Sequence, residues 1–189
     1  MCATATHALA GSLSAHGNSA AAARAYRKVL GLIEQFSDSN NSNVELPQAA
    51  DVMLLLVECL AGRTSRGADD TTKDVSEALS LVQKVLEINP SSITGRLQHG
   101  TLLLREMATT STSGSRSATQ RRDSLASRQQ AALDEFDVAI ALAEADSAVP
   151  CAAAHVKRAH LLESWADAKV GSRTAEAHES YAAALELIP

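Results

Sequence analysis

Residues 132–143 read ALDEFDVAIALA, and they place Ala132, Phe136 and Ala139 at positions i, i+4 and i+7. Side chains at this spacing lie on one stripe of an α-helix. The same pattern, with a small residue in the first place, returns at three other points: Ala22, Tyr26 and Val29; Ala78, Val82 and Val85; Ala177, Tyr181 and Ala184. Two copies are followed five residues later by a proline, which ends a helix because it lacks a backbone N–H. The recurrence predicts a helical repeat.

Strong helix formers dominate the chain on both sides of this stretch, and two polar segments interrupt them, at 37–44 and at 109–128. The second segment is dense in Ser, Thr and Arg, and we expect it to be a low-complexity insert without regular structure. Within it, RRDSL (121–125) matches the R-R-x-S-hydrophobic motif of basophilic kinases. Ser124 is therefore a candidate phosphorylation site, and an unmodified loop is the alternative.

The stretches AYRKVL, EALSLVQKVLEINP, ALDEFDVAIALA and ESYAAALELIP resemble the second helix of the tetratricopeptide repeat (TPR). That repeat, of about 34 residues, is a helix pair in which a small residue of the first helix faces the stripe of the second. The resemblance implies an all-α fold, a right-handed α-solenoid of antiparallel helix pairs, as one domain over 1–189. A generic helical bundle or another α-solenoid is the alternative.

The resemblance also divides the chain into repeats at about 3–36, 47–90, 91–146 and 149–189. The last three are longer than the family's repeat, so we expect inserts between their helices, near 62–73, 109–128 and 169–173. Gly100 takes the small first-helix position of the third repeat. The register of the second repeat, in which Val52, Leu55 and Cys59 share a stripe, is the least constrained.

Composition limits the classes of function that fit. Hydrophobic residues make up 46% of the chain, which fits a folded protein, and the formal net charge is −5. Because a nucleic-acid binder needs a basic footprint, this charge predicts that there is no nucleic-acid partner. We expect Cys2, Cys59 and Cys151 to be reduced core residues, since they are odd in number and widely spaced. We expect no signal peptide and no membrane span, and a cytoplasmic location with the nucleus open.

The sequence shows no constellation of residues typical of catalysis. His155 and His160 are five residues apart, whereas a zinc pair on one helix face needs a spacing of four. No Gly-rich phosphate loop and no nucleophile elbow is present. We therefore expect a protein that is not an enzyme and that holds neither a cofactor nor a metal.

In TPR proteins the first helices line a concave surface that binds the partner. Carried onto this chain, the resemblance implies that the candidate partner-binding residues are His7, Gly11, Met53, Val57, Leu97, Thr101, Arg105, Val156, His160 and Glu163.

Most of these residues are small or apolar, which suits an amphipathic helix or an apolar segment of another protein. We therefore expect a scaffold or adaptor, such as an assembly chaperone or a subunit of a complex. A helical regulatory domain of a larger enzyme is the alternative. RNA binding is disfavoured because the groove lacks basic and aromatic residues. The C-terminal helix, with the weakly apolar face Ser180, Ala183 and Leu187, is also expected to mediate self-association.

Overall fold

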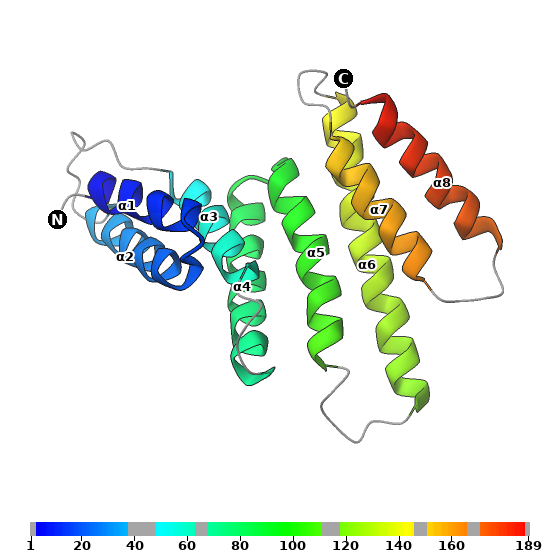
Figure 1. Cartoon of the computed structure of the whole chain (residues 1–189), viewed down its shortest axis with the longest axis horizontal. Coiled ribbons are helices and arrows are strands. Elements are labelled where there is room, and N and C mark those ends of the chain that lie inside the picture. Colours follow the sequence, from blue (N-terminus) through cyan, green and yellow to red (C-terminus); the bar gives the residue numbers. More distant parts are fainter. Residues whose placement is uncertain are drawn as a thin grey trace. The chain divides into compact units, whose positions relative to one another are not determined.

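The computed structural model describes residues 3–37, 48–62, 68–110, 118–145, 151–165 and 171–187, and within these ranges it contains eight α-helices and no strand (Figure 1). The expected all-α fold is confirmed. The helices are α1 (Ala3–Ala15), α2 (Ser19–Ser37), α3 (Ala49–Ala61), α4 (Ala68–Ile88), α5 (Ile93–Thr110), α6 (Ala118–Ala145), α7 (Ala152–Ser164) and α8 (Gly171–Glu186).

The helices form two compact units, Met1–Pro90 and Ser91–Pro189, each with two helix pairs. In the first unit α2 packs against α1 and α3, and α3 packs against α4. In the second unit α6 packs against α5 and α7, and α7 packs against α8. Each expected repeat therefore holds one pair of helices. The expectation of one domain over the whole chain stays a prediction.

The turn between α1 and α2 shows how the chain reverses between paired helices. Gly17 has a φ of +74°, a conformation that favours glycine, and its N–H donates to the Ser14 carbonyl over 2.9 Å. The Asn18 side chain then accepts a hydrogen bond from the Ala21 N–H at 3.2 Å and so caps the start of α2. The reversal brings α2 back against α1.

The stripes that define the repeats lie between the helices of each pair. Tyr26 is 1% exposed and Phe136 is 0% exposed, and the other members of their stripes are fully buried. The stripe of α8 differs, because Ala177 and Ala184 are buried while Tyr181 is only half-buried. Among the described residues, α8 has no following helix to cover this ring.

The prediction that 109–128 lacks regular structure is wrong for residues 109–110, which end α5, and for residues 118–128, which form the first turns of α6. Arg128 forms an ion pair with Glu106 of α5 at 3.2 Å, and Gln129 beside it is buried. Ser124 lies half-buried in the same helix. The Ser-rich composition suggested a loop, but the Ala, Gln and Arg residues between the serines extend the helix and α5 offers a surface for it. Residues 111–117 lie outside the described ranges.

The other two expected inserts are also shorter than predicted. Residues 68–73 belong to α4, and residues 171–173 belong to α8. In both cases polar residues that resemble a loop in sequence form the first turn of a helix.

Candidate binding surfaces on the first helices

In the second unit, the expected groove residues of α5 divide between core and surface. Leu97 packs against both buried clusters of this unit, so it belongs to the core rather than to an open groove. Thr101 is half-buried, and its hydroxyl donates to the Leu97 carbonyl over 2.7 Å. Arg105, one turn further along, is exposed. Of these three candidates, Arg105 is the one that carries a charge and is exposed to solvent.

The cationic pair of Arg105 on α5 and Lys157 on α7 interacts electrostatically. Burial lowers the pKa of Lys157 from its ordinary value, and the neighbouring positive charge of Arg105 lowers it further. The Lys157 side chain makes no hydrogen bond or ion pair with another residue that the structure describes. An anionic group placed beside both side chains would favour the charged form of Lys157. Arg105 was expected from the sequence but Lys157 was not, because the two lie 52 positions apart in the chain.

His160 and Glu163 of α7, both expected in the groove, meet Tyr181 of α8. The Tyr181 hydroxyl donates to Glu163 Oε2 over 2.8 Å and lies 3.1 Å from His160 Nδ1. The hydrogen bond to Glu163 raises the pKa of Tyr181 above its ordinary value. The rings of His160 and Tyr181 also meet edge to face, with centroids 5.6 Å apart. This polar cluster is exposed, and Val156 lies half-buried one turn before it.

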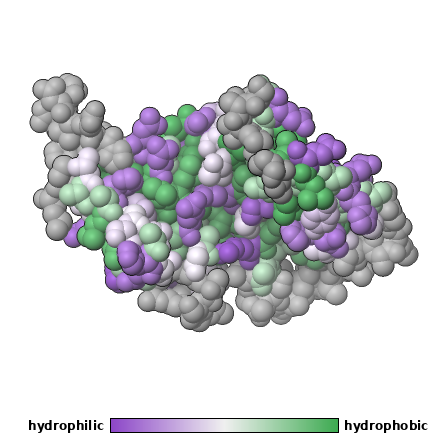
Figure 2. Space-filling model, turned by 45° about the horizontal axis from the view of Figure 1, so that its top comes forward, coloured by the Kyte–Doolittle hydropathy of each residue, from purple (hydrophilic) through white to green (hydrophobic). Residues whose placement is uncertain are grey.

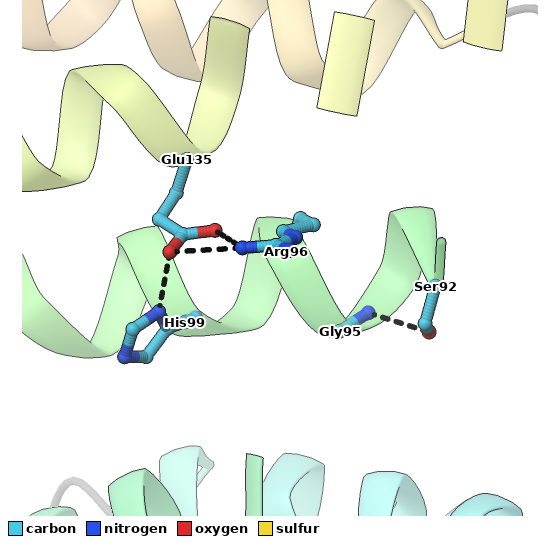
Figure 3. Close-up of polar contacts among 5 residues, drawn as sticks. All are labelled: Ser92, Gly95, Arg96, His99 and Glu135. Atoms are coloured by element: carbon cyan, nitrogen blue, oxygen red, sulfur yellow. Dashed lines mark hydrogen bonds and ion pairs between the residues drawn. The ribbon is translucent and has the colours of Figure 1, made fainter. Parts of the chain in front are cut away.

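A polar network holds α5 against α6 (Figure 3). Glu135 accepts hydrogen bonds from Arg96 at 3.0 and 3.3 Å, and its other contact is His99 Nδ1 at 2.9 Å. At the start of α5, the Ser92 hydroxyl accepts from the Gly95 N–H at 3.1 Å. The network fixes the helix that carries Arg105, and its residues were not singled out from the sequence as a set.

In the first unit, two expected groove residues lie against Tyr26. The His7 ring meets the Tyr26 ring edge to face at 5.9 Å, and a Cβ at Gly11 would lie 3.8 Å from the Tyr26 hydroxyl. His7 Nε2 is buried without a hydrogen-bond partner among the described residues. Both His7 and Gly11 therefore line the surface next to the buried tyrosine. Another expected groove residue of this unit, Met53 of α3, is half-buried.

Val57, the fourth expected groove residue of this unit, is only 1% exposed and is a core residue. The burial pattern explains this correction. In α7 the buried residues are Ala154, Ala159, Leu161 and Leu162, and in α3 the same spacing is Val52, Val57, Cys59 and Leu60. Val57 thus corresponds to the small packing residue Ala159, and the expected register of the second repeat was off by one. In the corrected register Glu58 takes the exposed place assigned to Val57.

The remaining surface is mixed. On the face drawn in Figure 2, hydrophobic and hydrophilic residues alternate over short distances. Among the described residues, no cluster of three or more His, Cys, Asp or Glu side chains could hold a metal ion, and Cys59 and Cys151 are buried free thiols. None of the described helices is both long enough and apolar enough to cross a bilayer.

Comparisons with known proteins agree on the fold. No family model and no curated protein matches the chain. Two solved structures of monomeric IFIT1 mutants, one with the capped RNA m7Gppp-AAAA and one with Gppp-AAAA, are similar to it. Each has a TM-score of 0.68 at 17% identity, and the matches cover 100% and 97% of this chain. The chain spans about a third of those proteins, 34% and 33% of their lengths. It has a TPR-like helical-repeat fold.

The expectation of no nucleic-acid partner is overturned by these neighbours, because both were solved with RNA. That expectation used the net charge of the whole chain, whereas RNA is held by the few side chains that face it. An overall charge of −5 is therefore no ground for excluding such a ligand.

Proposed function

We propose that this chain is a binding scaffold that holds a segment of another protein against its first helices. The proposal rests on the expected groove residues that remain partly exposed. These residues are uncharged and half-buried, and they include Gly11, Met53, Thr101 and Val156. Such surfaces suit an apolar segment or the apolar face of a helix, since they lose little solvation when they are covered. No catalytic group is required for this role.

Capped RNA is a second candidate ligand. The IFIT1 neighbours with m7Gppp-AAAA and Gppp-AAAA favour it, and so does the cationic pair of Arg105 and Lys157, which lies on first helices of this chain. Phosphate oxygens bind Lys and Arg side chains through charge-assisted hydrogen bonds. The two candidates use different side chains of the first helices.

Affinity capture with matched variants tests the first candidate. We expect Val156→Glu to lose proteins that the wild-type chain captures from a nuclease-treated lysate, because the charge enters the surface of α7. Val138→Glu on α6, where Val138 is already 41% exposed, serves as the control and should capture the same proteins as wild type. Identical capture by all three chains would overturn the proposal.

Fluorescence anisotropy with labelled m7Gppp-AAAA tests the second candidate. Binding that weakens at least tenfold in Lys157→Glu and Arg105→Glu, but not in Lys84→Glu on the exposed face of α4, would support RNA as the ligand. Absence of any saturable signal would remove this candidate. A helical regulatory domain of a larger enzyme is the remaining alternative. A binding scaffold of this kind is compatible with that role.

A further inference from the structure

The helices α1 and α8 each expose a face, and the equivalent faces of α7 and α6 are packed against each other. On α1, Ala5, Leu9 and Ser12 share a stripe and are all exposed, with Leu9 at 52%. On α8, the exposed stripe is His178, Ala182 and Leu185, with Leu185 at 71%. Leu9 and Leu185 are among the few large apolar side chains that the described surface exposes.

The contact between α6 and α7 shows how the equivalent faces pack against each other. Near one end, Ala154 of α7 shares a buried cluster with Ala139 and Ala143, and Ile140 packs on it. In the middle, Arg158 donates to Asp137 over 2.6 Å. Near the other end, Leu161 and Leu133 belong to one buried cluster. The order of these contacts shows that the two helices run antiparallel.

The uncovered faces correspond to this interface residue by residue. Counted from the small packing residues Ala159 and Ala10, the α7 residues Ala154, Arg158 and Leu161 match Ala5, Leu9 and Ser12 of α1. Counted from the aromatic residues Phe136 and Tyr181, the α6 residues Leu133, Asp137 and Ile140 match His178, Ala182 and Leu185 of α8. The chain thus carries both halves of one helix–helix contact, each without its complement among the described residues.

We propose that α1 of one copy docks on α8 of a second copy as α7 docks on α6. In this contact Ala5 meets Leu185, Leu9 meets Ala182, and Ser12 meets His178. The ion pair of the internal interface is replaced by an apolar contact, and the Ser12 hydroxyl faces an imidazole with which it can form a hydrogen bond. The occupant is a second copy because the two faces correspond, residue by residue, to the two sides of the contact between α6 and α7. This proposal is independent of the function proposed above.

Such a contact joins two different surfaces, so copies add head to tail rather than pairing symmetrically. One helix packed on another buries a small area, and interfaces of that size are weak and exchange quickly. The self-association expected from the sequence used Ser180, Ala183 and Leu187, but Ser180 is 4% exposed and donates to the Glu176 carbonyl over 3.0 Å. Leu187 of that expected face is 37% exposed, and the more open face is the one that contains Leu185, which is 71% exposed.

Sedimentation velocity over a range of concentrations tests the proposal. We expect the wild-type chain to sediment faster as its concentration rises, and Leu9→Glu and Leu185→Glu each to remain monomeric. Leu125→Glu on α6, where Leu125 is 40% exposed, is the control and should associate like wild type. Circular dichroism establishes that each variant is folded. Wild-type protein that stays monomeric at every concentration would overturn the proposal.

Mixing experiments separate head-to-tail docking from symmetric pairing. Leu9→Glu retains a native α8 face and Leu185→Glu retains a native α1 face, so their mixture should form dimers and nothing larger. A chain that carries both Leu9→Arg and Ala182→Asp should also associate, in a salt-sensitive manner, because the two changes recreate the pair formed by Arg158 and Asp137 at each contact. If Leu9→Glu associates as well as wild type, or if the mixture forms no dimers, α1 is not the occupant of the α8 face.

Discussion

A Cβ atom placed on Gly100 would lie 2.6 Å from Cε1 of Phe136, closer than two carbon atoms approach each other in folded proteins. Gly100 is buried in α5, and Phe136 is fully buried in α6. The same hypothetical atom would lie 3.1 Å from the Ala132 carbonyl, which cannot rotate away. The missing side chain of Gly100 therefore makes room for the aromatic ring that holds the third helix pair together.

Gly100→Ala should destabilise the fold by about 1–3 kcal/mol, because the added methyl group overpacks the interface. Gly31→Ala is the matched control, since Gly31 is helical and its Cβ would meet nothing within 4 Å. That change should stabilise α2 by about 0.5–1 kcal/mol through helix propensity. Urea denaturation followed by circular dichroism measures both. Equal effects of the two substitutions would show that the Phe136 contact does not control stability.

Ser124→Pro should destabilise the chain by about 3 kcal/mol or more, because a proline inside α6 removes a backbone hydrogen bond and its ring clashes with the preceding turn. Ser124→Ala should be neutral or slightly stabilising, since alanine has the highest helix propensity. Thermal denaturation of the three chains compares them. A proline variant as stable as wild type would mean that 118–128 behaves as the loop predicted from its composition.

The two tyrosines of the chain should respond differently to one substitution. Burial raises the pKa of Tyr26, and the hydrogen bond to Glu163 raises the pKa of Tyr181. Each phenol should therefore stay protonated past the pH at which a free tyrosine ionises. Glu163→Gln removes the carboxylate acceptor and should lower the pKa of Tyr181 alone. Absorbance at 295 nm during an alkaline titration measures this, in a Tyr26→Phe background for Tyr181 and in a Tyr181→Phe background for Tyr26. An unchanged Tyr181 titration would contradict the assigned cause.

The pKa of Lys157 should rise when Arg105 becomes alanine, because the loss of a neighbouring positive charge favours the protonated amine. The rise should be partial, since burial is the larger cause of the depression and the substitution does not abolish it. Lysine side-chain NMR across an alkaline titration follows the ε-CH₂ shift. Arg24→Ala, which removes an exposed arginine of α2, is the control and should leave Lys157 unchanged. A fall in the pKa would show that Arg105 does not repel Lys157.

The spacing of apolar residues was sufficient to predict the helices and their pairing. Ala132, Phe136 and Ala139 lie on one helical stripe whatever surrounds them, because the period of the helix is a local property of the backbone. The small partner Gly100 was found by counting along the same repeat. Composition, in contrast, misled at 118–128. Its serines are typical of loops, and only packing against α5, through Arg128 and Glu106, shows why the helix continues.

By itself, the sequence determined the all-helical class, the repeated stripe and the residue types available on the first helices, since each depends on order along the chain. Only the tertiary structure decided which of those side chains are open to a ligand. Val57 and Leu97 differ from Arg105 in what packs on them from other helices, and the proximity of Arg105 and Lys157 exists only after folding. Tyr26 is buried while Tyr181 remains half-exposed, although their local sequences match, because burial depends on whether a neighbouring helix covers the ring.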